Sequence, residues 1–465
     1  MSAGRTPPNI VLITADQLRY DCVEPNAPGA PHTPNLARLA AEGVRFTQAY
    51  SHVPVCGPAR QSLLCGRRPE SFGGLWNAGA ALPVGSLSPD EWTWPKALQE
   101  RGYASAFLGK WGVHPRLGPT AYGYDRAVGA ADYEAFRKDA YPDVAFAGGF
   151  FGEPNPIPVE DASTHWLARQ AVREIERLHA EGRPWHVALH FAEPHLPCRP
   201  SGRFADMYDP ADMRPWPGFG DTFEGKPYIQ RQQLCSWGVE SFGWADWAPI
   251  VARYYGVVSQ LDDAIGHVLR ALDRLGADDT LVVFTADHGD MCGSHGMMDK
   301  HYIMYDDVVR VPMIMRWNGA LPAGAVCGRF AYGFLDLAPT FAEAAGLNRP
   351  ERLHGDSLLP LLRGGGEALW RREAVIATYN GQQFGLYCQR MIRTERWKYV
   401  WNLTDVDELY DLEADPGELV NRIGEAKLAD IVAELRRRLY ETLLADEDGF
   451  DNEWTRRQLL AGRKL

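Results

Sequence analysis

The sequence predicts an α/β fold in which a doubly wound, mostly parallel central sheet is flanked by helices and followed by a smaller α+β domain. Two observations predict the sheet. Short runs of apolar and β-branched residues end next to polar residues, and stretches with apolar residues at helical spacing separate these runs. A third observation, a change of pattern after a glycine run, predicts the second domain. Alternating strands and helices are typical of a sheet covered on both faces.

Four runs are the strongest strand candidates. The first, from Asn9 to Thr14, is followed by Asp16 and Gln17. The other three have the same arrangement and are 104–108 before Gly109-Lys110, 185–191 before Glu193-Pro194-His195, and 280–285 before Asp287-His288. The ligand crevice of a doubly wound sheet lies outside the carboxyl ends of its strands. We therefore expect the polar residues after these runs to meet in one place.

The connecting segments contain both helical and irregular patterns. Helical spacing of apolar residues predicts helices over 34–42, 95–101, 164–178 and 252–275. The segment from about Cys198 to Trp247 is rich in Pro, Gly, Trp and Phe, which predicts a long irregular excursion. It could form a substrate-facing wall or an ordinary surface loop, and composition leaves both open.

The run Gly364-Gly365-Gly366 marks the predicted domain boundary. We expect a large α/β domain over residues 1–365, which carries the chemistry, and a small α+β domain over residues 366–465. In the small domain the pattern predicts short strands at 373–379, 387–394 and 397–401, and a helix at 428–444. A chain of 465 residues exceeds the usual size of a single core, which favours this division.

The composition excludes several classes of function. The formal charge of −12 argues against a nucleic-acid partner, because phosphate backbones attract basic surfaces. No apolar run is long enough to span a bilayer, so no membrane partner is expected. The N-terminus lacks the apolar core and cleavage site of a signal peptide, which predicts a cytoplasmic protein. The eight cysteines show no CxxC spacing, so most are predicted to be buried thiols.

The most specific motif is Cys56-Gly57-Pro58-Ala59-Arg60, followed by Leu63-Leu64-Cys65-Gly66-Arg67. It resembles the signature of the sulfatase family, C-x-P-[SA]-R with a trailing L-L-x-G-R. Further segments also resemble conserved sulfatase segments, in the family's order and over nearly the whole chain. These segments are Thr33 to Phe46, Gly109-Lys110-Trp111, Pro194 to Pro197, Thr285 to Asp290, Arg310 to Ile314, and Glu408 to Leu412 with Asp415-Pro416 and Asn421. The resemblance implies the fold of the alkaline phosphatase superfamily.

The resemblance also implies an unusual nucleophile at Cys56. In this family a formylglycine-generating enzyme oxidises the cysteine to formylglycine. A thiol or alcohol that attacked sulfur would be trapped as a stable ester, whereas a hydrated aldehyde attacks with one hydroxyl and expels sulfate by collapse through the other. A divalent cation helps the hydrate to ionise and polarises a sulfuryl oxygen.

The residues implied to hold this cation are Asp16, Gln17, Asp287, His288 and the matured Cys56. Calcium is the first expectation because most of these ligands are oxygens, and magnesium is an alternative. The imidazole of His288 and the neutral amide of Gln17 keep manganese as a further alternative.

Other residues match positions that act on the substrate in this family. Lys110 and Lys300 are implied to face the sulfate oxygens. His195 is implied to contact the sulfuryl group or to assist the leaving oxygen. Arg60 is implied to orient the hydrated aldehyde from the first turn of the following helix, and Asn77 is implied to bind substrate.

Two positions depart from the common sulfatase pattern. Many sulfatases have Asp-Asp where this chain has Asp16-Gln17, and histidine where it has Gly112. His114 lies two residues further on, but it is given no role because neighbouring loop residues need not point the same way. The Asp-Gln pair and Asn77 resemble the phosphonate monoester hydrolase branch, which does not usually have lysine at the position of Lys110.

The expected function is hydrolysis of a small-molecule sulfate ester, as in arylsulfatases. The alternative is hydrolysis of a phosphonate monoester or phosphodiester at the same site. A less favoured interpretation is an inactive relative that only binds an anion or a metal. Catalysis by two metal ions is the least favoured interpretation, because Lys110 and Lys300 occupy the place that a second cation would need. Homo-oligomerisation is left open.

Overall fold

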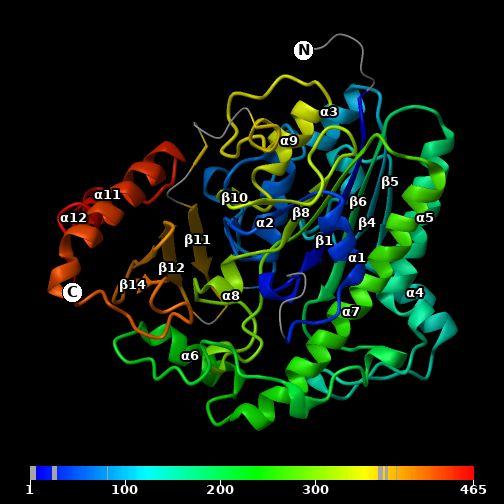
Figure 1. The fold of residues 1–465 in the computed structure, drawn as a ribbon. Helices are drawn as coiled ribbons and strands as arrows, with labels where there is room; N and C mark the ends of the chain where they lie inside the picture. The colour runs from blue at the N-terminus through cyan, green and yellow to red at the C-terminus, as the bar shows by residue number, and fades with distance from the viewer. Residues whose placement is uncertain are drawn as a thin grey trace.

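The protein is described by a computed structural model over residues 7–23, 29–80, 82–364, 370–371, 375–383 and 385–464. Eight of the described strands form a mixed sheet of order β5-β4-β6-β1-β7-β8-β2-β9 (Figure 1). These strands are β1 (Asn9–Asp16), β2 (Val44–Phe46), β4 (Ala104–Gly109), β5 (Arg126–Gly129), β6 (Trp185–Pro194), β7 (Thr280–Ala286), β8 (Met313–Arg316) and β9 (Ala325–Cys327). Only β8 runs antiparallel to its neighbours among them, so the predicted mostly parallel sheet is confirmed.

The four predicted strands are confirmed as β1, β4, β6 and β7, which are neighbours in the middle of the sheet. β1 pairs in parallel with β6 on one side and with β7 on the other. At their carboxyl ends Asp16 is in register with Pro194, and Ala15 is in register with Ala286. The residues that follow these strands therefore leave the sheet at the same edge.

Helices cover both faces of this sheet (Figure 1). One layer contains α1 (Pro34–Ala41), α5 (Ser163–Ala180) and α7 (Trp244–Leu275), and α4 (Ala130–Ala140) packs against α5. The other contains α2 (Cys56–Cys65), α3 (Trp94–Glu100) and α9 (Leu337–Ala344). Shorter elements complete this region, and they are β3 (Ala49–Tyr50), β10 (Ala331–Tyr332), α8 (Asp306–Val309) and α10 (Leu359–Leu362).

The prediction for the segment from Cys198 to Trp247 is wrong in part. It contains α6 (Tyr228–Trp237), and α7 begins at Trp244 rather than at residue 252, with Pro249 inside the helix. The buried face of α6 includes Gln230 and Gln233, which donate to Glu408 and to the carbonyl of Met298. Because polar side chains occupy this buried face, the apolar periodicity that predicts a helix is weak.

The C-terminal part forms a four-stranded antiparallel sheet with helices packed against it (Figure 1). Its elements are β11 (Val375–Gly381), β12 (Tyr387–Arg393), β13 (Trp397–Asn402), β14 (Glu408–Asp411), α11 (Ala429–Ala445) and α12 (Glu453–Leu459). The three predicted strands and the long helix are confirmed within the described residues, while residues 373 and 374 of the first strand lie outside them. The elements β14 and α12 were not predicted.

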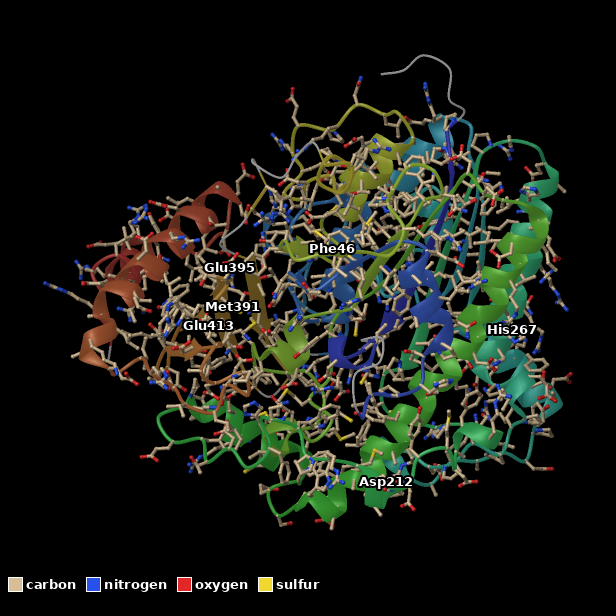
Figure 2. The ribbon with its side chains drawn as sticks, viewed as in Figure 1. Phe46, Asp212, His267, Met391, Glu395 and Glu413 are labelled. Carbon is tan, nitrogen blue, oxygen red and sulfur yellow. The ribbon has the colours of Figure 1, made fainter. Side chains whose placement is uncertain are left out.

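The two sheets share a hydrophobic core. Met391 of β12 and Phe46 of β2 are both buried and belong to the same cluster of packed side chains (Figure 2). Gly365 and Gly366 of the predicted boundary lie outside the described residues, so the division at residue 365 stays a prediction. No helix in the described part of the chain is both long and apolar enough to cross a lipid bilayer. Five of the eight cysteines are buried, as expected for most of them.

The first turn of α1 depends on a carboxylate from α7. Asp262 is buried; its Oδ1 accepts a hydrogen bond from the backbone N–H of Leu36 at 2.8 Å, and its Oδ2 accepts one from that of Asn35 at 3.0 Å. These N–H groups belong to a helix start, where they have no acceptor within the helix. Asp262 thus joins α1 to α7 across their interface.

We predict that Asp262→Ala lowers the free energy of unfolding by about 2–4 kcal/mol, because it leaves two N–H groups without an acceptor. Urea denaturation followed by circular dichroism measures this loss. Asp273→Ala is the matched control on the same helix, since Asp273 forms an exposed ion pair with Arg38. That change is expected to cost less than about 1 kcal/mol. Equal losses of unfolding free energy in the two variants would contradict the role of Asp262 as the acceptor for the first N–H groups of α1.

Candidate active site

The polar residues that follow the central strands meet at one edge of the large sheet. Asp16 ends β1, Lys110 follows β4, His195 follows β6, and Asp287 and His288 follow β7. The Nζ atom of Lys110 lies 2.6 Å from Oδ2 of Asp16, and Nε2 of His195 lies 4.0 Å from Oδ1 of Asp16. The expectation that these strands bring their polar residues together is confirmed.

Arg60 of α2 lies at the centre of this group of polar side chains. Its side chain is buried, and Nη2 donates to Oδ2 of Asp16 at 2.8 Å and to Oδ2 of Asp287 at 3.0 Å. Its Nη1 donates to the carbonyl of Lys110 at 2.9 Å and lies 2.9 Å from Nδ1 of His190. The planar guanidinium fork thereby joins α2 to the ends of β1, β4 and β7.

Cys56 is the first residue of α2 and faces the same cluster. Its buried Sγ lies 3.2 Å from Nε2 of His288, and 3.6 Å from both Oδ1 of Asp16 and Nζ of Lys110. Burial and Asp16 raise the pKa of the thiol, but Lys110, Lys300 and His288 lower it more, so it lies well below its usual value. Position 56 therefore favours a group that carries negative charge.

Four side chains are close enough to share one metal ion. One ligand atom each from Asp16, Cys56, Asp287 and His288 lies within 4.8 Å of the others. The Nδ1 atom of His288 lies 2.9 Å from the carbonyl of Gly289, which assigns the proton to Nδ1 and leaves Nε2 to face the centre. Two carboxylates and one imidazole suit a divalent cation of the calcium, magnesium or manganese type.

The pKa shifts of Asp287 and His288 also favour a bound cation at this cluster. Burial and the neighbouring Asp16 raise the pKa of Asp287, because two carboxylates at one buried site repel each other. Burial lowers the pKa of His288, but Asp287 and Cys56 raise it more, to about 9. A bound cation would offset the charge of the carboxylates and keep the imidazole neutral.

The side chain of Gln17 is oriented by hydrogen bonds to two neighbours. Its Oε1 accepts from Nζ of Lys300 at 2.8 Å, and its Nε2 donates to the carboxylate of Asp290. Its backbone N–H donates to Oδ1 of Asp287 at 3.1 Å. Gln17 lies beside the cluster, and its role as a metal ligand stays a prediction. Asp290 received no role from the sequence, although it ends the segment Thr285 to Asp290.

Lys300 and His195 form a pair at the site. The Nζ atom of Lys300 lies 2.9 Å from Nε2 of His195, and 3.3 Å from a carboxylate oxygen of Asp299. The Nδ1 atom of His195 lies 2.7 Å from the carbonyl of Leu196, which assigns the proton to Nδ1 and makes Nε2 the acceptor. Burial lowers the pKa of Lys300, but Asp299 and Cys56 raise it more, so this lysine keeps its charge.

Asn77 contacts the start of α2. Its Oδ1 accepts a hydrogen bond from the backbone N–H of Gly57 at 2.8 Å. A Cβ atom at Gly57 would lie 2.7 Å from that oxygen, so the contact requires glycine. The structure thus shows Asn77 supporting the turn that carries Cys56, and its predicted role in substrate binding stays a prediction.

The histidine missing at position 112 is not replaced by His114 in this structure. Nδ1 of His114 accepts hydrogen bonds from the backbone N–H groups of Arg116 and Leu117, at 3.1 and 3.0 Å. Gly112 lies against Arg60, where an added Cβ would be 3.2 Å from Cδ of the arginine. His114 therefore closes its own turn.

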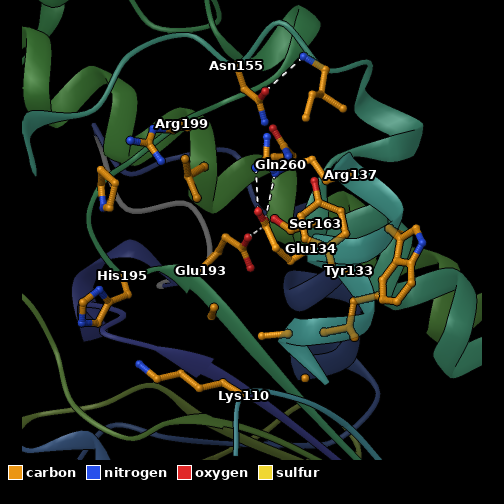
Figure 3. Close-up of a pocket in the computed structure, with 18 of the residues that line it drawn as sticks. Lys110, Tyr133, Glu134, Arg137, Asn155, Ser163, Glu193, His195, Arg199 and Gln260 are labelled. Carbon is orange, nitrogen blue, oxygen red and sulfur yellow. Dashed lines mark hydrogen bonds and ion pairs between the residues drawn. The ribbon is translucent and has the colours of Figure 1, made fainter. Parts of the chain in front are cut away.

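A cavity of about 610 Å³ lies beside the cluster (Figure 3). Lys110 and His195 line it, and the rest of the wall comes largely from β6, α4, α5 and the segment between these helices. Within the described part of the excursion from Cys198 to Trp247, Arg199 alone contributes to this wall. Tyr133, Ser163 and Glu193 also line this cavity, and the sequence analysis gave them no role. Of the three, only Glu193 could have been found from the sequence, because it lies just after a predicted strand.

Comparison with known proteins agrees with this geometry. The sulfatase family model matches residues 8–347, and a model described as N-sulphoglucosamine sulphohydrolase, C-terminal, matches residues 293–444. A curated relative, the N-acetylglucosamine-6-O-sulfatase of Bacteroides thetaiotaomicron, is 26% identical over 96% of this chain and 88% of its own length.

Solved structures of phosphonate monoester hydrolases share the fold. The enzyme from Silicibacter pomeroyi superimposes with a TM-score of 0.82 at 24% identity, over 95% of this chain and 96% of that chain. The enzyme from Agrobacterium radiobacter gives a TM-score of 0.79 at 26% identity, over 95% of both chains. With the family model covering most of its length, the chain belongs to the sulfatase family and is a sulfuric ester hydrolase or a closely related ester hydrolase.

Proposed function

We propose that the protein hydrolyses a sulfate ester, using Cys56 matured to formylglycine beside one divalent cation. The observation that carries this proposal is the position of Cys56 at the start of α2. Its Sγ faces a carboxylate, an imidazole and a lysine, all within 3.6 Å. An inert structural cysteine would not require so many charged groups around it.

The cation would be held by Asp16, Asp287, His288 and the matured residue 56, with Gln17 as a further ligand. When bound, such a cation lowers the pKa of a hydroxyl group and polarises an oxygen of the ester. Calcium is the first choice, and magnesium and manganese are alternatives. Arg60 keeps the two carboxylates side by side, because one of its nitrogens donates to both.

Formylglycine supplies a hydrated aldehyde, whose second hydroxyl allows the anion to be released after attack by the first. A formylglycine-generating enzyme would be the partner in maturation. Asn77 would hold the turn around residue 56 through the N–H of Gly57.

Lys110 and Lys300 would neutralise the charge that develops on the ester oxygens. Both lower the pKa of the group at position 56, so their charges act there. His195 lines the cavity and its Nε2 is hydrogen-bonded to Lys300. This pair would hold a proton on the side where the leaving oxygen departs.

Hydrolysis of a phosphonate monoester or phosphodiester is the second candidate. Gln17 favours it, because this Asp-Gln pair resembles that branch of the superfamily and the solved structures of phosphonate monoester hydrolases share this fold. Lys110 favours a sulfate ester, because the phosphonate branch does not usually have lysine there. Both candidates use a small anionic ester and the same site.

We predict that Cys56→Ala lowers turnover by at least about a thousandfold, because the nucleophile is lost while the fold remains. Steady-state hydrolysis of para-nitrophenyl sulfate and circular dichroism spectra measure these two effects. Cys65→Ala is the matched control, since Cys65 is a buried thiol at the other end of α2. Full activity in Cys56→Ala would eliminate the mechanism, and an inactive wild type with complete maturation would indicate a silent relative.

We predict that Asp287→Ala weakens cation binding by at least about a hundredfold and loses activity with it, because a charged ligand is removed. Calorimetric titration with calcium, magnesium and manganese measures the affinity. Asp278→Ala removes an exposed carboxylate just before the amino end of β7 and should leave both properties unchanged. A fully active Asp287→Ala protein without bound metal would rule out the cation site.

The two substrate classes are separated by comparing para-nitrophenyl sulfate with para-nitrophenyl phenylphosphonate on one metal-loaded preparation. We predict the higher kcat/KM for the sulfate ester, because both lysines face the position of the anion. A preference of about a hundredfold for the phosphonate, or close to 3 kcal/mol in transition-state binding, would make phosphonate hydrolysis the function.

A further inference from the structure

The cavity beside the reaction centre contains a carboxylate without a positive partner. Glu193 lies at the end of β6, two residues before His195, and lines the cavity between His195 and Ser163 (Figure 3). Its carboxylate accepts a hydrogen bond from the hydroxyl of Ser163. No lysine or arginine of the described residues forms an ion pair with it. Burial raises the pKa of Glu193, in keeping with an uncompensated charge.

The other charges of this wall already have partners. Arg137 donates to both carboxylate oxygens of Glu134, at 2.9 and 2.6 Å. The guanidinium of Arg199 lies 4.1 Å from the centre of the Phe146 ring and 3.7 Å from a carboxylate oxygen of Glu153. The unmatched charge in the wall is therefore the negative one of Glu193.

Apolar and aromatic side chains line part of the same cavity. Tyr133 and Trp166 line the cavity with their ring centres 5.5 Å apart, and Leu167 and Leu196 add aliphatic surface. Glu193 is half-buried, and taking a carboxylate even partly out of water costs free energy unless a positive group pairs with it. Aromatic faces also attract cations, including amines and quaternary ammonium groups.

We propose that this cavity receives the alcohol part of the ester and that Glu193 selects an alcohol with a positively charged nitrogen. This inference rests on the proposed function, because it places the ester bond between the anion site and the cavity. Lys110 and His195 belong to both places, so an alcohol leaving the reaction centre enters this space. The substrate would carry an anionic group at one end and a cationic group at the other.

The test compares pairs of esters that differ only in charge. Sulfate esters of amino alcohols with chains of two to five carbons are compared with sulfate esters of the matching diols. Phosphonate esters of the same alcohols replace them if that class is preferred. At least one amino alcohol should give a kcat/KM about tenfold or more above its diol, as expected for one charge-assisted hydrogen bond.

In Glu193→Gln the kcat/KM values of the two esters in each pair should differ by no more than about threefold, because the charge is lost while an acceptor for Ser163 remains. Glu193→Asp should keep part of the preference. Glu176→Gln is the control, since it removes the same charge from an exposed ion pair with Arg274 on the outside of α5. This control should select the amino alcohol esters as the wild type does.

A binding measurement separates this inference from the proposed mechanism. Calorimetric titration of the free amino alcohols and diols requires no modified Cys56, so it works on protein without turnover. Tighter binding of an amino alcohol to wild type than to Glu193→Gln supports the inference. Equal kcat/KM values within every ester pair, with active enzyme, would overturn it. Absence of turnover for every ester would contradict the proposed function instead, and the titration would still test Glu193.

Discussion

The placement of two carboxylates, Asp16 and Asp287, beside each other in a buried site is the constraint on which the rest of this structure depends. They come from neighbouring parallel strands and repel each other unless positive charge lies between them. Arg60 meets part of this need by donating to both. Because Arg60 belongs to α2, the same contact fixes the helix whose first residue is Cys56. The position of Cys56, the proposed nucleophile, thus follows from the electrostatics of the strand ends.

Positive side chains lie near position 56, and a negative one lies in the neighbouring cavity. Lys110 and Lys300, which both lower the pKa of Cys56, lie on the side proposed for the anion, whereas Glu193 lines the cavity proposed for the alcohol. A net charge of −12 is compatible with the proposed anion site, because burial makes the local charges count more than the distant ones. The same separation of charge would orient an ester in one direction only.

The central strands and the residues after them could be predicted because the chain repeats one pattern: an apolar run, then polar groups at its carboxyl end. The signature around Cys56 predicted the nucleophile, and this role stays a prediction. The cavity wall could not be predicted, because Tyr133 and Ser163 lie on helices where nothing marks them as inward-facing. The helix α6 was missed because its buried face includes Gln230 and Gln233, whose partners lie far away in sequence. Such pairings appear only when the chain is folded.

The proposed mechanism requires an aldehyde at position 56 in the active protein. The most direct measurement is the mass of the tryptic peptide 46–60, taken from protein made in a host with a formylglycine-generating enzyme and compared with the activity of the same preparation. The proposed mechanism predicts a peptide mass in which a carbonyl replaces the thiol group, in a fraction that rises and falls with activity. A fully active preparation whose peptide carries only an unmodified cysteine would contradict it.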